Sequence, residues 1–76
     1  METLMEILKE LKPFVDFEKE EHLIDEHILN SLEIMTLVSR IDDEFDVQIP
    51  LVEVVPENFQ SAKAIHRMIV RVQEEE

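Results

Sequence analysis

The most restrictive feature of this 76-residue chain is that it contains no glycine. Glycine supplies the positive φ angles of tight β-hairpin turns, so short hairpins are disfavoured here. The phosphate-cradling loops of nucleotide-binding proteins and the standard EF-hand calcium loop also require glycine at fixed positions. These classes are therefore excluded in their usual form, and helices joined by turns are the natural expectation.

Length, charge and cysteine count narrow the possibilities further. Seventy-six residues suffice for one small domain, which we place at 1–76. Nineteen acidic against seven basic residues give a net charge of −12, which disfavours nucleic acid and favours a basic protein surface as partner. The chain has no cysteine and no apolar run longer than the three residues at 68–70. We therefore expect no disulfide, no membrane span and a cytoplasmic monomer.

Helical periodicity and the prolines divide the chain into segments. Apolar residues at i, i+3, i+4 and i+7 predict a first helix over about 2–12, which Pro13 ends. A short helix beginning with proline is predicted over about 56–60, and a last helix over about 61–73. Residues 13–30 lack a clean period but hold seven large apolar residues, so we expect a loop docked on the core.

The remaining helix is predicted over about 31–45. Asn30 is a good N-cap, and Glu33 completes a capping-box pattern. At about 100° per residue, one face of this helix is apolar, comprising Ile34, Met35, Val38, Ile41 and Phe45. Leu32 points away from that face, which predicts an exposed leucine beside the helix start. Replacing Ile41 or Phe45 by alanine is expected to cost roughly 2–5 kcal/mol if both are buried.

These segments predict an all-α fold. With three main helices and one short helix, the expected architecture is a small four-helix bundle. Residues 51–55 are compatible with either a short helix or an extended segment.

The acidity is segregated along the chain. Residues 16–46 contain eleven acids and only two cations, whereas residues 62–72 contain three cations and no acid. This distribution is compatible with an ordinary solvated surface. It is also typical of an acidic face that steers a basic partner surface.

Several motifs together resemble those of the acyl carrier and peptidyl carrier protein family. They are Leu29-Asn30-Ser31-Leu32, an acid-edged helix ending in Asp42-Asp43-Glu44-Phe45-Asp46, and then Ile49-Pro50. The resemblance covers nearly the whole chain and is nearest to stand-alone carriers such as D-alanyl carriers. It implies an acyl-carrier-like helical bundle. A chain of this size also has too little surface for a deep pocket, so we do not expect it to be an enzyme.

The resemblance implies that Ser31 carries a covalent 4′-phosphopantetheine arm derived from coenzyme A. The protein would hold an acyl or aminoacyl group as a thioester on this arm and present it to partner enzymes. The implied partners are a phosphopantetheinyl transferase and an adenylate-forming ligase or acyltransferase with a basic docking surface.

The resemblance also implies a set of partner-recognition residues around Ser31, namely Asn30, Leu32, Glu33, Asp43 and Glu44. Position 30 departs from the family, which usually has aspartate there. Asparagine keeps the capping ability but loses a charge that would help the transferase to recognise its substrate. Ile34 and Met35 would line a route for a long acyl chain or, alternatively, belong to the ordinary core.

Two other interpretations can be drawn from the residues. An unmodified acidic helical module that binds a basic partner would account for the charge pattern without any use of Ser31. His22, Asp25, Glu26 and His27 lie close in sequence, but their spacing is not that of a zinc motif, and we expect no metal.

Overall fold

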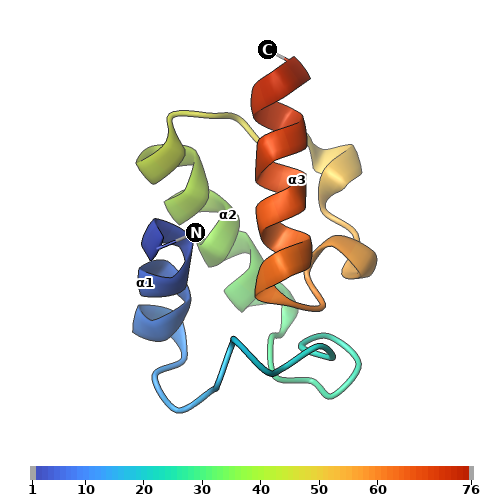
Figure 1. Ribbon diagram of the computed structural model, residues 1–76. Coiled ribbons are helices and arrows are strands. Elements are labelled where there is room, and N and C mark those ends of the chain that lie inside the picture. The colour runs from blue at the N-terminus through green and yellow to red at the C-terminus, as the bar shows by residue number, and fades with distance from the viewer. Residues whose placement is uncertain (1, 76) are drawn as a thin grey trace.

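The computed structural model describes residues 2–75, which form three α-helices and two single turns of 3₁₀ helix, with no strand among them. In chain order these are α1 (Glu2–Leu11), α2 (Ser31–Phe45), η1 (Leu51–Glu53), η2 (Pro56–Asn58) and α3 (Ala62–Glu75). Figure 1 shows α1 and α2 on one side of α3, and the two 3₁₀ turns on the other.

The all-helical class predicted from the sequence is confirmed, but two details differ. The short helix expected over 56–60 is the single turn η2, and the preceding segment contributes a second turn, η1. Helix α3 continues to Glu75, beyond the expected end at 73. Its last turns are anchored because Val72 is buried in the core.

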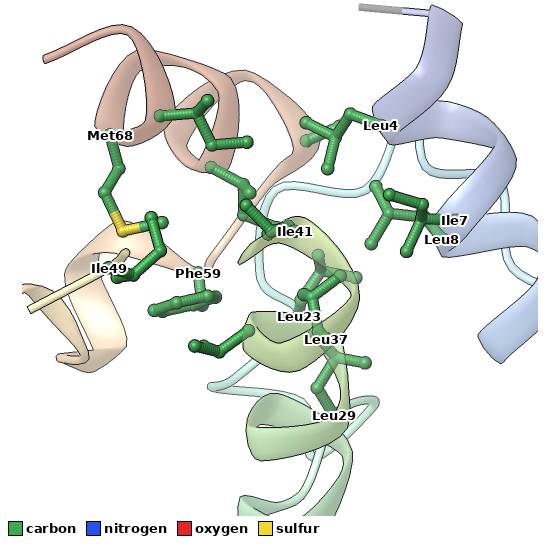
Figure 2. Close-up of a cluster of buried hydrophobic side chains, with 14 of the residues drawn as sticks. Leu4, Ile7, Leu8, Leu23, Leu29, Leu37, Ile41, Ile49, Phe59 and Met68 are labelled. Carbon is green, nitrogen blue, oxygen red and sulfur yellow. The ribbon is translucent and has the colours of Figure 1, made fainter. Parts of the chain in front are cut away.

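One apolar core joins every part of the chain. Figure 2 shows side chains converging from the three helices, the long loop and residues 49–59, which contain η1 and η2 and are called the η segment below. The largest fully buried side chains are Phe59, Leu4, Leu8, Leu23, Leu37, Ile41, Ile65, Met68 and Ile69. Because the loop and the η segment contribute to this cluster, their positions are coupled to the packing of the helices.

The buried face of α2 is rotated from the one predicted. Leu37, which the predicted face omits, is fully buried together with Ile41, whereas Met35 is 52% exposed. Phe45 is only half-buried. Helix α1 packs against α2, and Leu37 and Ile41 belong to the same buried cluster as Ile7 and Leu8 of α1 (Figure 2).

The loop between α1 and α2 docks on the core, as expected. Phe17, Leu23 and Leu29 are buried, and the backbone N–H groups of Ile28 and Leu29 both donate to the Leu23 carbonyl, at 2.9 and 3.0 Å. Phe14 is the exception, because its side chain is fully exposed.

Because the chain has no glycine, other residues adopt its left-handed backbone conformation. Two residues of the described chain have positive φ, His27 at 59° and Asp46 at 51°. Asp46 is the C-cap of α2, where many helices have glycine in the left-handed conformation. Aspartate tolerates this conformation better than most side chains do, but at some cost in free energy.

None of the helices within residues 2–75 combines the length and the apolar character needed to cross a membrane.

Candidate functional site

The start of α2 is built by a capping box. Asn30 has an extended backbone, with φ −97° and ψ 176°, and its side-chain oxygen accepts a hydrogen bond from the Glu33 N–H at 2.9 Å. In return, the Asn30 N–H donates to Glu33 Oε1 at 3.1 Å. Ser31 is thereby held as the first helical residue, and it is exposed. Its hydroxyl lies in the first turn, where backbone N–H groups have no intrahelical acceptor and the helix dipole is positive.

A shallow apolar groove begins at Ser31. It has a volume of about 240 Å³ and runs between α2 and the η segment. Its lining residues are Ser31, Ile34, Met35, Val54, Val55, Pro56 and Phe59. Ile34 and Met35 are therefore walls of a surface groove rather than members of the fully buried core.

Exposed apolar side chains flank this groove. Leu32 is 76% exposed, as its position on the helix predicted, and Met35 lies on the same helix. Across the groove, Val55 is also exposed, and η1 adds Leu51 and Val52. Of these exposed residues, Met35 and Val55 line the groove itself. Exposed large apolar side chains on neighbouring elements are typical of a surface that contacts another molecule.

The Glu33 carboxylate forms an ion pair and a hydrogen bond within the protein. Its Oε2 lies 2.7 Å from Lys12 Nζ, and its side chain is 19% exposed. The hydrogen bond from Lys12 lowers the pKa of Glu33, and the bond from the Asn30 N–H acts in the same direction. Glu33 thus has a structural role in addition to the recognition role predicted for it. The capping box was expected from the sequence, whereas the ion pair was not, because Lys12 is 21 residues away.

The chain is similar to curated carrier proteins. It is 33% identical to aminoacyl carrier protein 2 of Bradyrhizobium diazoefficiens over 70 residues, which are 92% of this chain and 78% of that protein. It is 40% identical to aminoacyl carrier protein 1 of the same organism over 42 residues, or 55% of this chain and 47% of that protein. The chain belongs to the acyl and aminoacyl carrier protein family. No protein-family model and no solved structure matches it.

Membership of this family gives the chain a carrier function, and carrier proteins are not themselves enzymes. In this carrier protein the predicted acidic contacts Asp43 and Glu44 lie exposed on the last turn of α2. They are separated from Ser31 by about 18 Å along the helix axis. A partner that touches both ends must therefore cover most of the length of α2.

Asp42 has a different role in this carrier protein. Its Oδ1 accepts a hydrogen bond from the Ile49 N–H at 3.1 Å, and its carbonyl accepts from the C-cap residue Asp46. Asp42 is half-buried and fixes the chain reversal after α2. It therefore serves the fold rather than the exposed acidic face.

The acidic and histidine residues of the loop do not assemble into a cluster. His22 Nδ1 lies 3.7 Å from Asp25 Oδ2, with both side chains exposed. Within residues 2–75, no three histidine or carboxylate side chains are placed to share a metal ion.

Proposed function

We propose that this carrier protein holds an acyl or aminoacyl group as a thioester on a 4′-phosphopantetheine arm attached to Ser31. The observation that carries the proposal is the exposed Ser31, fixed by a capping box at the first position of α2. The two similar proteins are named aminoacyl carriers, which supports an aminoacyl cargo. A D-alanyl carrier is one form of that proposal.

The surroundings of Ser31 fit such an arm. A phosphodiester on its hydroxyl would lie near the free N–H groups and the positive end of the α2 dipole, both of which favour an anion. The apolar groove leads away from the same residue. When attached, the arm supplies the thiol that this cysteine-free chain lacks.

The protein's own residues would then present the arm. Asn30 and Glu33 fix the helix start, and Leu32 offers an exposed apolar contact beside the attachment point. Asp43 and Glu44 supply negative charge for the basic docking surface of a ligase or acyltransferase, and the transferase that installs the arm would use the same helix. We propose that the protein acts as a cytoplasmic monomer.

Attachment can be tested by intact mass after incubation with coenzyme A and a broad-specificity phosphopantetheinyl transferase. One added phosphopantetheinyl group is expected, and it should be absent from Ser31→Ala. Ser39→Ala is the matched control, because Ser39 is also exposed on α2 and should leave the addition intact. An unmodified protein, or a modified Ser31→Ala variant, would overturn the proposal.

A second candidate function is an unmodified acidic module that binds a basic partner. It is favoured by Asn30, which lacks the charge expected of a good transferase substrate, and by the exposed acids on α2. Asn30→Asp distinguishes the two functions. If Asn30 only weakens recognition, both forms should be modified and the aspartate variant faster, whereas a module that is never modified should show no addition to the wild type. Addition to the aspartate variant alone would identify Asn30 as the reason.

A further inference from the structure

Gln60, in the connection between η2 and α3, makes four hydrogen bonds to one turn of the distant loop. Its backbone carbonyl accepts from the Leu23 N–H at 2.9 Å. Its side-chain Oε1 accepts from the N–H groups of Ile24 and Asp25, at 3.1 and 3.3 Å. Its Nε2 donates to Asp25 Oδ1 at 2.9 Å. Both the amide oxygen and the amide nitrogen of the half-buried Gln60 side chain are thus hydrogen-bonded to residues about 35 positions earlier in the chain.

This clasp, defined as Gln60 with residues 23–25, connects the two chain segments that lead to the walls of the groove at Ser31. On one side, Gln60 directly follows Phe59, which lines the groove together with residues 54–56. On the other side, the clasped turn continues through two hydrogen bonds to the Leu23 carbonyl and ends at Leu29. The next two residues are the N-cap of α2 and Ser31. Figure 1 shows this loop passing beneath the start of α3 before it enters α2.

We propose that Gln60 is a positioning residue for Ser31. Its hydrogen bonds fix the segment that leads into α2 relative to the groove wall at Phe59. They therefore set the position of the Ser31 hydroxyl during the reaction that attaches the arm. The inference rests on the proposed function, because attachment to Ser31 is the reaction that it concerns. A small displacement of a reacting hydroxyl slows group transfer strongly without weakening docking elsewhere on the surface.

The bond between the Gln60 amide and the Asp25 carboxylate can be tested by exchanging the amide and the carboxylate between the two residues. In Gln60→Glu, a carboxylate oxygen replaces Nε2 and faces the carboxylate of Asp25, so the contact becomes repulsive. Adding Asp25→Asn restores a donor, because the new amide can donate to the new carboxylate. Asp25→Asn alone should be harmless, since its amide oxygen can still accept from Gln60. Gln73→Glu is the matched control for charge, because Gln73 is exposed on α3.

The measurement is the steady-state kinetics of arm attachment by a phosphopantetheinyl transferase, with coenzyme A, at a temperature where each variant is folded by circular dichroism. Gln60→Glu should lower kcat about tenfold with little change in KM, because docking on α2 is retained. The Gln60→Glu/Asp25→Asn double variant, Asp25→Asn and Gln73→Glu should all stay within about twofold of the wild type. If Gln60→Glu fails to fold, Gln60→Ala, which removes only the three side-chain bonds, takes its place in the kcat comparison.

The outcomes separate this inference from the proposed function. A wild-type protein that is never modified would overturn both. A wild type that is modified at Ser31, with an equal kcat for the clasp variants, would overturn the positioning role alone. A Gln60→Glu defect that Asp25→Asn does not rescue would also overturn it, because the loss would then come from added charge or general loosening.

Discussion

Lys12 Nζ lies 2.7 Å from Glu33 Oε2, and this ion pair joins the residue after α1 to the first turn of α2, two residues beyond Ser31. Because Glu33 also accepts the Asn30 N–H, the pair extends the capping box to a second helix. The α1–α2 flank is further linked by Arg40 and Glu10. The negative charge of Glu33, in the same helical turn as Ser31, is therefore paired with Lys12 within the protein.

Lys12→Met should raise the pKa of Glu33 toward its ordinary value, because the hydrogen bond from Lys12 is the main cause of its depression. A carboxyl whose pKa is lowered by folding stabilises the native state at neutral pH, and this contribution is lost as the pH falls through the folded-state pKa. The variant should therefore lose less stability on acidification than the wild type does. NMR titration of the Glu33 carboxyl checks the pKa, and acid unfolding checks the linkage.

Lys9→Met is the matched control for that experiment. Lys9 is exposed on α1 and has no ion pair among residues 2–75, so its removal should leave the Glu33 titration unchanged. An equal shift in both variants would mean that the general field of the protein, and not the Lys12 contact, sets the pKa.

The rotated face of α2 gives a stability prediction. Leu37→Ala and Ile41→Ala should each lower the free energy of unfolding by roughly 2–5 kcal/mol, because both side chains are fully buried. Met35→Ala should cost less than about 1 kcal/mol, because its side chain is half-exposed in the groove. Phe45→Ala should fall between them. Urea unfolding followed by circular dichroism measures all four, and a large loss at Met35 would favour the face predicted from the sequence.

This rotation shows where sequence reasoning reaches its limit. Periodicity and caps located α1 and α2 closely, because Pro13 and the Asn30–Glu33 pair mark ends through local chemistry alone. Which flank of α2 turns inward depends on where α1 packs, and that is a property of the assembled core. Leu37 was therefore missed although it is fully buried.

Some features of the candidate site could likewise be predicted from the sequence, and others could not. The position of Ser31 at the start of α2 and the exposure of Leu32 could be predicted from the sequence, because both follow from helix position and the cap. The partners Lys12 and Gln60 could not, because each acts across 21 to 37 residues and no local pattern marks it. The groove wall formed by Val54 and Val55 could not be predicted either, because residues 51–55 were compatible with both a short helix and an extended segment.

Asp46→Gly should stabilise the protein. Asp46 has φ 51° and ψ 48° at the C-cap of α2, a conformation that glycine adopts without steric cost. We expect a gain of about 0.5–1 kcal/mol in the free energy of unfolding. Asp46→Asn separates charge from backbone, because asparagine also tolerates the left-handed region. Asp43→Gly, on the same helix but in a right-handed turn, should instead cost about 0.3–0.5 kcal/mol. A loss at both glycine variants in thermal or urea unfolding would contradict the prediction.

The exposed acids on the last turn of α2 should control the rate at which partners dock. Asp43→Lys/Glu44→Lys reverses the charge at two carboxylates that make no hydrogen bond within residues 2–75, in contrast to those of Glu33 and Asp42. We expect kcat/KM for arm attachment at Ser31 to fall about tenfold at low ionic strength, and the difference from wild type to shrink as salt is added.

Glu2→Lys/Glu6→Lys gives a control with the same change in net charge, because both residues are exposed on α1. It should reduce kcat/KM much less, since a docked partner on α2 would not contact that face. Equal losses in the two double variants would mean that net charge alone attracts the partner. An unchanged rate after reversal of Asp43 and Glu44 would remove the acidic end of α2 from the docking surface and confine recognition to the first turn and the groove.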